Sequence, residues 1–231
     1  MKRRDAPIID PARTVPSDLD DFVQFVAMLA TNYFHRSNYV TVAGRSYLSI
    51  YDSTFFIQEL GIAAISAARR WLRDNGHNDV HLAAIEPNDD VLPFVREIGF
   101  DSVTHYVLLP DWKGPFQQDY REYAELRASQ WQSFGDRANL PYMPAVAPGW
   151  DASPRGADFG TKRPDKYPWS PVIIGEHPDL FAAAVQRARA FRSPVSVDDP
   201  LVLIASLNEW SEGHYLEPDE RFGMGWLEAV R

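Results

Sequence analysis

The chain has 231 residues, of which 45% are hydrophobic and 13% aromatic, and a formal net charge of −9. This composition supports a globular core, and the acidic balance argues against a nucleic-acid-binding surface, which needs an excess of Lys and Arg. Cysteine is absent, which excludes disulfides, thiolate metal sites and cysteine nucleophiles. No signal-peptide core and no run of roughly 20 apolar residues is visible, so the sequence predicts a cytoplasmic protein without a membrane span.

The predicted elements alternate between strands and helices. Residues 1–16 are expected to form an extended lead-in, followed by one domain over residues 17–231. In the first part of the chain we expect a helix from Ser17, a turn or hairpin over 39–44, a strand over 46–51, a helical region over 53–75 interrupted near Gly61, a strand over 80–85 and a helix over 89–98. A strand over 102–108, a helix over 118–134 and a strand over 142–147 follow. The rest of the chain is expected to form a long polar loop over 153–176, a helix over 178–191, a strand over 201–207 and a last helical turn over 224–230.

This order repeats a strand–helix unit about five times, and such alternation predicts parallel strands with right-handed crossovers. Two α/β architectures fit the pattern: an open doubly wound sheet, or an arc of a (β/α)8 barrel. A complete barrel takes about 250 residues and eight strands. The predicted strands fall short of that number.

The stretch Leu201–Pro218 changes abruptly from apolar to polar. Its apolar start indicates a strand buried on both faces. The polar or aromatic residues that follow are Asn208, Glu209, Trp210, Ser211, Glu212, His214 and Glu217. Active sites of α/β folds are built where parallel strands end, so we interpret Glu209 and Glu212 as a functional pair. Solvated loop glutamates are the simpler alternative, but an indole between two carboxylates is typical of a sugar site.

Other strand ends supply further candidates, each with a structural alternative. These are Asp52, Glu86, His105 with Tyr106, and Trp150 with Asp151 and Arg155. Asp52 is equally well explained as a helix cap, and Glu86 as a solvated turn residue. His105 is more typical of a hydrogen-bonded core or lumen residue than of a catalyst. The last group is stronger, because tryptophan, acid and arginine at one strand end seldom serve packing alone.

Several other chemistries lack their motifs. The sequence holds no H-E-x-x-H, no Walker loop and no G-x-S-x-G elbow. The six histidines show no metal-ligand spacing. We therefore predict neither a metal nor a cofactor.

Three segments carry a family resemblance. Residues 208–219, N-E-W-S-E-G-H-Y-L-E-P-D, resemble the N-E-W-x-E-G…L-E-P-D signature of the WbsX-type proteins. That group is glycoside hydrolase family 99-like and has been labelled glycosyltransferase in polysaccharide gene clusters. Residues 146–155, V-A-P-G-W-D-A-S-P-R, resemble a second family motif, P-G-W-D-x-[ST]-x-R, and the aromatic-rich segment 33–51 resembles a third. The matches extend from about Asn32 to the C-terminus.

The resemblance implies a (β/α)8 barrel acting on glycans. Family members also carry a preceding part with the first barrel strands, and by this resemblance the present chain begins at the lead-in to the fourth. We therefore expect a partial barrel that is marginally stable alone, and that self-associates or takes the missing strands from a partner.

In family 99 hydrolases the two glutamates of the motif cleave an α-mannoside with retention. By this resemblance Glu209 is the base that deprotonates the 2-hydroxyl of the sugar, and Glu212 is the acid/base. Substrate binding is expected of Asn208, Trp210, Trp150, Asp151, Arg155, Asp52, Glu86 and Tyr106. One alternative is a glycosyltransferase of surface polysaccharide biosynthesis, although no phosphate-cradling glycine loop is present. Another is a non-catalytic glycan-binding or vestigial barrel.

Overall fold

The computed structural model describes residues 18–159 and 167–231. The predicted lead-in over 1–16 and the helix start at Ser17 lie outside the described residues. Within the described part the first helix, α1 (Leu19–Asn32), is capped by Asp18, whose carboxylate accepts a hydrogen bond from the backbone N–H of Asp21. The side chain of Asp21 in turn accepts the N–H of Asp18, so the helix begins with a capping box.

A parallel sheet forms the first half of the molecule. Its strands, in the order β1-β2-β3-β4, are β1 (Thr41–Val42), β2 (Arg45–Ile50), β3 (Val80–Ile85) and β4 (Ser102–Thr104). β2, β3 and β4 run parallel to one another. β1 is antiparallel to β2, which realises the hairpin that the sequence allows over 39–44.

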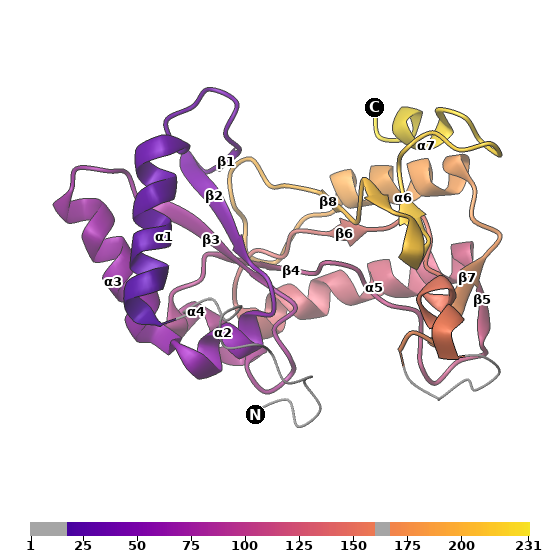
Figure 1. Cartoon of the computed structure of the whole chain (residues 1–231), viewed down its shortest axis with the longest axis horizontal. Coiled ribbons are helices and arrows are strands. Elements are labelled where there is room, and N and C mark those ends of the chain that lie inside the picture. Colours follow the sequence, from indigo (N-terminus) through magenta and orange to yellow (C-terminus); the bar gives the residue numbers. More distant parts are fainter. Residues whose placement is uncertain (1–17, 160–166) are drawn as a thin grey trace.

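The curved array continues into the second half of the chain (Figure 1). Val103 of β4 forms a parallel bridge with Tyr142, and the same chain segment leads into β6 (Ala145–Val146), which pairs in parallel with β8 (Leu203–Ile204). The parallel strands therefore follow chain order, β2, β3, β4, β6 and β8. This arrangement confirms the predicted α/β fold with a partial (β/α)8 barrel.

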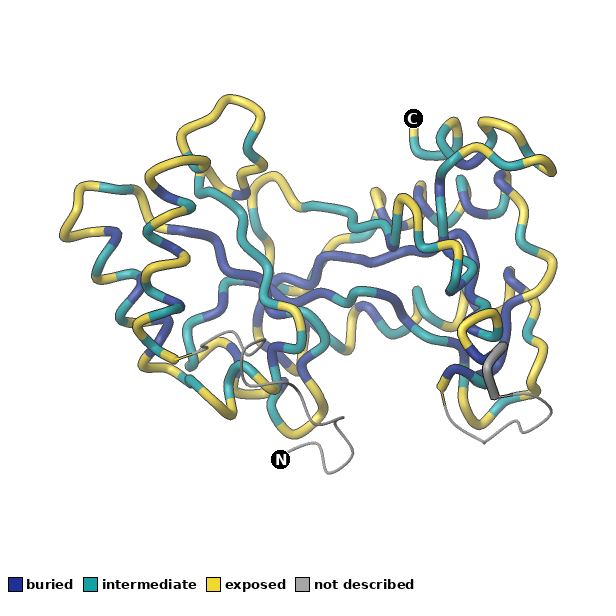
Figure 2. The backbone as a smooth tube through the Cα atoms, viewed as in Figure 1, coloured by how far each residue is buried: buried dark blue, intermediate teal, exposed yellow. Residues whose placement is uncertain are grey.

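Helices cover one face of the array, and strand alternation explains why. The main helices are α1, α2 (Ser53–Glu59), α3 (Gly61–Asp74), α5 (Tyr120–Ala138) and α6 (Pro178–Ala190). In β3, Val80, Leu82 and Ala84 join the apolar core that contains the helices, whereas His81 stacks on Tyr47 on the other face. Figure 2 shows the resulting buried backbone running along β3, β4 and β6 through the middle of the molecule.

Some predicted boundaries are wrong for identifiable reasons. The helix expected over 89–98 is a 3₁₀ turn, η2 (Leu92–Phe94), followed by the short α4 (Val95–Ile98). The side chain of Asn88 accepts the Val91 N–H in a competing turn, and Pro93 has no N–H to donate. The strand expected over 102–108 contains the shorter β4. Glu86, which follows β3, has a φ of 51° and still donates its backbone N–H to the Thr104 carbonyl at 3.0 Å.

The polar loop expected over 153–176 contains regular structure. It begins with η3 (Ser153–Phe159) and includes β7 (Val172–Ile174), which pairs in parallel with β5 (Gln117–Asp119). Asp119 then caps α5 by accepting the N–H of Arg121 and Glu122. The chain ends with α7 (Gly225–Glu228). No helix among the described residues is long and apolar enough to cross a membrane.

An ion network closes the N-terminal end of β2, β3 and β4. Asp101 lies next to β4. Its carboxylate forms ion pairs with Arg45 at 2.9 Å and Arg69 at 2.6 Å, and it accepts a hydrogen bond from the Leu82 N–H at 2.8 Å. Arg69 also pairs with Asp79. Burial alone would raise the pKa of Asp101, but the Leu82 N–H and the two guanidiniums outweigh it and hold the pKa below its usual value.

We predict that Asp101→Asn lowers the free energy of unfolding by about 2 kcal/mol near pH 7, the scale of a lost charged hydrogen bond. Because the pKa of Asp101 is lowered by folding, its contribution exists above the unfolded pKa of about 4 and is lost as the pH falls through the folded value. The difference between wild type and variant in urea denaturation should therefore shrink in acid.

The matched control is Asp74→Asn, which breaks the exposed pair with Arg73, where the two side chains are 60% and 71% exposed. This change should stay within about 0.5 kcal/mol of wild type. Equal stability of the two variants would contradict a structural role for the network.

Candidate active site

The predicted catalytic motif folds into a small hairpin beyond β8. It comprises β9 (Asn208–Glu209), the 3₁₀ turn η4 (Trp210–Glu212) and β10 (His214–Tyr215), with β9 and β10 antiparallel. Gly213 turns the chain with a φ of 69°, and a Cβ there would lie 2.7 Å from the Asp151 nitrogen. Only glycine fits this approach, which brings the hairpin against the segment that follows β6.

One guanidinium joins the two glutamates. Nη2 of Arg155 lies 2.7 Å from Oε1 of Glu209, and its Nη1 lies 2.9 Å from Oε1 of Glu212. Both nitrogens belong to one planar fork, so the two carboxylate oxygens lie within about 8 Å of each other. Carboxylate pairs that act together on a glycosidic bond lie about 5 to 9.5 Å apart. The spacing therefore permits joint chemistry.

Two hydroxyl groups complete this junction in the same way. Ser211 Oγ accepts from Nε of Arg155 at 2.8 Å and donates to Glu209 at 2.8 Å. Tyr167 Oη accepts from Nη1 of Arg155 at 2.7 Å and donates to Oε1 of Glu212 at 2.8 Å. Each glutamate is thus bound by the guanidinium and by one hydroxyl that the guanidinium also orients.

The two carboxylates have different surroundings. The Glu209 side chain is 31% exposed, and that of Glu212 is 9% exposed. Hydrogen bonds from Ser211 and then Arg155 hold the pKa of Glu209 below its usual value, which keeps this carboxyl ionised near neutral pH. Oε2 of Glu212 faces inward, 3.1 Å from Nε2 of His214. One carboxylate is therefore open and charged, and the other is held inside the fold.

His214 and Tyr167 belong to this cluster but are not among the predicted site residues. His214 is fully buried, between a stacked Trp150 ring with centroids 5.5 Å apart and the edge-on ring of Tyr106 at 5.7 Å. Its position in the motif, two residues after Glu212, is the signal in the sequence that points to it. Tyr167 comes from a proline-rich loop without periodicity, and nothing in the sequence singles it out.

Trp150 and Asp151 pack against the hairpin that carries the two glutamates. Trp150 is 4% exposed, and its indole N–H donates to Ser170 Oγ at 2.9 Å. The backbone N–H of Asp151 donates to the Glu212 carbonyl at 2.7 Å, and its carboxylate accepts the Ser153 N–H at 2.9 Å. Since Ser153 opens η3, which carries Arg155, these two residues fix both the hairpin and the helix that supplies the guanidinium. Arg155 itself joins the glutamates directly.

Trp210 and Asn208 lie on the outer side of the hairpin. Trp210 is 45% exposed and stacks on Tyr215 with ring centroids 3.6 Å apart. Its indole N–H donates to Oε2 of Glu217 at 2.6 Å. Asn208 is exposed at the start of β9. Trp210 therefore presents an aromatic surface next to Glu209.

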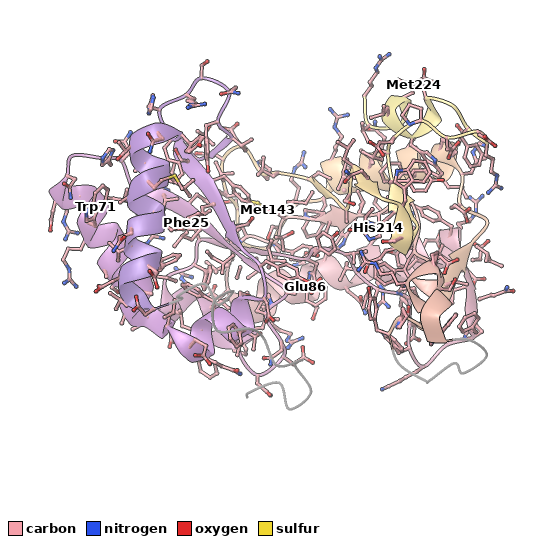
Figure 3. All side chains as sticks on the ribbon, in the orientation of Figure 1. Phe25, Trp71, Glu86, Met143, His214 and Met224 are labelled. Atoms are coloured by element: carbon pink, nitrogen blue, oxygen red, sulfur yellow. The ribbon has the colours of Figure 1, made fainter. Side chains whose placement is uncertain are left out.

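The remaining candidates follow β2, β3 and β4. Tyr106 reaches the cluster through His214, and its ring is also edge-on to Tyr51 at 6.0 Å. Glu86 accepts the Val107 N–H at 3.4 Å, and burial raises its pKa despite this hydrogen bond. Figure 3 shows Glu86 between the two helical flanks and His214 on the β9–β10 side. Asp52 caps α2 by accepting the Phe55 N–H at 3.2 Å, as the structural alternative predicts.

His105 occupies a core position. Its Nδ1 lies 3.0 Å from the Tyr142 hydroxyl, and its ring lies 4.4 Å from the Phe134 ring of α5. Burial lowers its pKa to about 4, so the imidazole is neutral. It points toward the helix layer, away from the glutamates, as expected for a hydrogen-bonded core histidine.

A separate groove of about 550 Å³ is lined by Trp150, Asp151 and Gly213 but by neither glutamate of the motif. Its other lining residues include Glu176, Tyr215, Arg221, Phe222 and Trp226. Arg221 pairs with Glu176 at 3.1 Å. Among residues 18–159 and 167–231 no group of three or more His, Asp or Glu side chains is arranged to hold a metal ion.

Sequence comparisons identify relatives over almost the whole chain. A family model described as "Glycosyltransferase WbsX" matches residues 16–230. "Uncharacterized protein WxcX" of Xanthomonas campestris pv. campestris is 30% identical over 243 residues, which cover 97% of this chain and 31% of the relative. The protein of the same name from strain B100 matches equally. The chain thus spans about a third of the length of these curated relatives.

Structural comparisons identify neighbours with the same fold. A "Glycoside hydrolase-like protein" has a TM-score of 0.62 at 16% identity, covering 92% of this chain and 59% of its own. The GH99 endo-alpha-mannosidase from Bacteroides thetaiotaomicron has a TM-score of 0.59 at 14% identity, covering 94% of this chain and 62% of its own. Its complex with BIS-TRIS-propane gives 0.58 at 16% identity, with coverages of 94% and 66%. At these identities the likeness establishes a shared fold.

We predict that Arg155→Met raises the pKa of Glu209 toward the usual value of about 4.3, because the guanidinium that favours its ionised form is removed. Ser211→Ala should act in the same direction, since its hydroxyl is the larger cause of the lowered pKa. Carbon-13 NMR of carboxyl-labelled glutamate, titrated with acid, measures both effects.

Arg221→Met is the control, because that arginine pairs with Glu176 in the separate groove. It should leave the titration of Glu209 unchanged. An unaltered Glu209 midpoint in Arg155→Met would show that the pairing of Arg155 with Glu209 does not persist in solution.

Proposed function

This chain belongs to the WbsX glycosyltransferase family, and on that basis we propose that it is a carbohydrate-active enzyme that cleaves an α-mannoside-type glycan with retention of configuration. The observation that carries the proposal is the single Arg155 guanidinium bound to both glutamates of the motif. It brings a carboxylate that is ionised near neutral pH and a sheltered carboxylate to one site. An oxocarbenium-like transition state needs such a pair, one group to carry negative charge and one to move a proton.

In the proposed first step Glu209 accepts the proton of the sugar 2-hydroxyl. The oxygen O2 attacks C1 as the bond from C1 to the leaving oxygen breaks, and Glu212 gives its proton to that oxygen. The lowered pKa of Glu209 supports its role as the group that starts the cycle ionised. The small exposure of Glu212 supports its role in holding a proton away from bulk water.

In the second step the Glu212 carboxylate accepts a proton from water as the water oxygen bonds to C1. The bond between C1 and O2 breaks, and O2 takes back the proton held by Glu209. Two inversions at C1 give net retention. Glu212 returns to its protonated form and Glu209 to its charged form, so the cycle closes.

Substrate binding has to break contacts between Arg155 and the two glutamates. The Arg155 side chain is 37% exposed, and it forms an ion pair with Oε1 of each glutamate. We propose that sugar hydroxyls and the glycosidic oxygen replace its contacts, while Arg155 binds substrate hydroxyls beside the site. Trp210, which offers an exposed ring next to Glu209, provides a stacking surface for a sugar face.

The alternative is transfer of a sugar to an acceptor, which the family description favours. The same intermediate accommodates it if an acceptor hydroxyl takes the place of water in the second step. A nucleotide-sugar donor would in addition need positive charge for its diphosphate. The charges of Glu209 and Glu212 beside Arg155 oppose a second anion there, which favours the neutral glycoside as substrate.

We predict that cleavage of α-mannosyl oligosaccharides falls by about 10² to 10⁴-fold in Glu212→Gln and in Glu209→Gln, the usual range for losing proton transfer. Proton NMR of the first product should show the α-anomer. Glu176→Gln, in the separate groove, is the control and should retain wild-type turnover.

The same variants distinguish the alternative. Transfer from sugar nucleotides to an acceptor, lost in the glutamate variants and without α-mannoside cleavage, would establish the transferase. If the protein binds oligosaccharides but neither cleaves α-mannosides nor transfers sugars, its function is lectin-like and the proposal of an enzyme is overturned.

A further inference from the structure

His214 makes a hydrogen bond to the inner oxygen of Glu212. Its Nε2 lies 3.1 Å from Oε2, and no part of the imidazole is exposed. Trp150 lies parallel to one face of the ring at an interplanar angle of 10°, and Tyr106 meets it edge-on. The ring has no room to turn, so its two nitrogens have fixed partners.

The second nitrogen of the ring faces Ser206. Oγ of Ser206 lies 3.3 Å from Nδ1 and 3.3 Å from the His214 carbonyl oxygen. A neutral imidazole carries one proton, on either nitrogen. If the serine hydroxyl donates to Nδ1, then Nε2 carries the proton and donates to Glu212. If Nδ1 carries the proton, Nε2 and Oε2 are two acceptors facing each other unless the carboxyl proton lies between them.

The charges around the ring favour the first arrangement. Burial lowers the pKa of His214, although the neighbouring Glu212 and Glu209 carboxylates raise it, so the ring is neutral near pH 7. In the substrate-free site Arg155 and the Tyr167 hydroxyl both donate to Oε1 of Glu212, which suits a carboxylate; the proton used in the first step is taken up when substrate displaces these two donors. An ionised carboxylate needs a donor at Oε2, and Nε2 is the group placed there.

The two oxygens of Glu212 therefore differ. Oε2 faces a buried ring that cannot leave. The partners of Oε1 are the exposed Arg155 and Tyr167 side chains, which a ligand can displace. When Glu212 takes up a proton, the position at Oε2 is already occupied by an N–H. The proton is then carried by Oε1, on the open side.

We infer that His214 is a positioning residue that donates from Nε2 to Oε2 of Glu212 and so directs the carboxyl proton to Oε1. The inference rests on the proposed function, in which Glu212 gives and takes that proton. It adds a residue and an atom to that mechanism: the glycosidic oxygen should approach Oε1, and Nε2 should keep its hydrogen through both steps.

Nitrogen-15 NMR of histidine-labelled protein tests the tautomer without substrate. The His214 resonances are identified by their loss in His214→Gln. We expect a neutral Nε2–H ring near pH 7 in wild type. A neutral Nδ1–H ring, or a charged ring near pH 7, would overturn the inference.

Carbon-13 titration of Glu212 tests the donated hydrogen bond. His214→Phe keeps a flat ring but has no donor, so the Glu212 midpoint should rise by about one pH unit. His214→Gln is the conservative variant, because its amide N–H can take the place of Nε2, and the midpoint should stay near wild type. Equal midpoints in all three proteins would show that His214 only fills space and would overturn the inference.

The two proposals fail separately. If the chain cleaves no glycan, the NMR measurements still report whether His214 orients Glu212. If it does cleave α-mannosides, His214→Phe should lower kcat more than it raises KM and shift the basic limb of the rate profile upward, while His214→Gln restores the profile. A loss of turnover with an unmoved pH profile in both variants would leave the enzyme in place and contradict the role given to His214.

Discussion

A carboxylate that is almost wholly removed from water must be given hydrogen bonds, because the cost of leaving it unpaired exceeds that of most single substitutions. The hydrogen-bond partners of Glu212 come from separate segments of the chain. η3 contributes Arg155, the loop before β7 contributes Tyr167, and β10 contributes His214. The backbone after β6 donates the Asp151 N–H to the Glu212 carbonyl. The hydrogen bonds to Glu212 thus hold the β9–β10 hairpin, the loop with Tyr167 and the segment after β6 together in one site.

The parallel strands could be predicted because their pattern is local. Apolar runs such as 80–85 end at polar residues, and alternation with helices fixes their direction. The proximity of the glutamate pair to Arg155 could also be anticipated, since their segments follow parallel strands, whereas their role in catalysis stays a prediction. The helix predicted over 89–98 is not regular, because the Asn88 side chain bonds to the backbone there and Pro93 lacks an N–H.

The supporting contacts could not be predicted in the same way. Tyr167 meets Glu212 across 45 positions of sequence, and its loop carries no periodic signal. The pairing of β5 with β7 joins Gln117 to Val172, which are still further apart along the chain, and the polar β5 carries no strand pattern. His214 reads as one more polar residue of the motif until its surroundings show that it is fully buried. Contacts of this kind depend on tertiary packing, which overrides local preference.

We propose that Glu209 and Glu212 act on one sugar, and a crystal structure of Glu212→Gln with an α-mannosyl disaccharide bound would test this. We expect the 2-hydroxyl of the mannose against the Glu209 carboxylate and the glycosidic oxygen beside the side chain at position 212, with Arg155 moved off both. A disaccharide bound in the groove lined by Tyr215 and Arg221, with Arg155 still joined to Glu209, would contradict it.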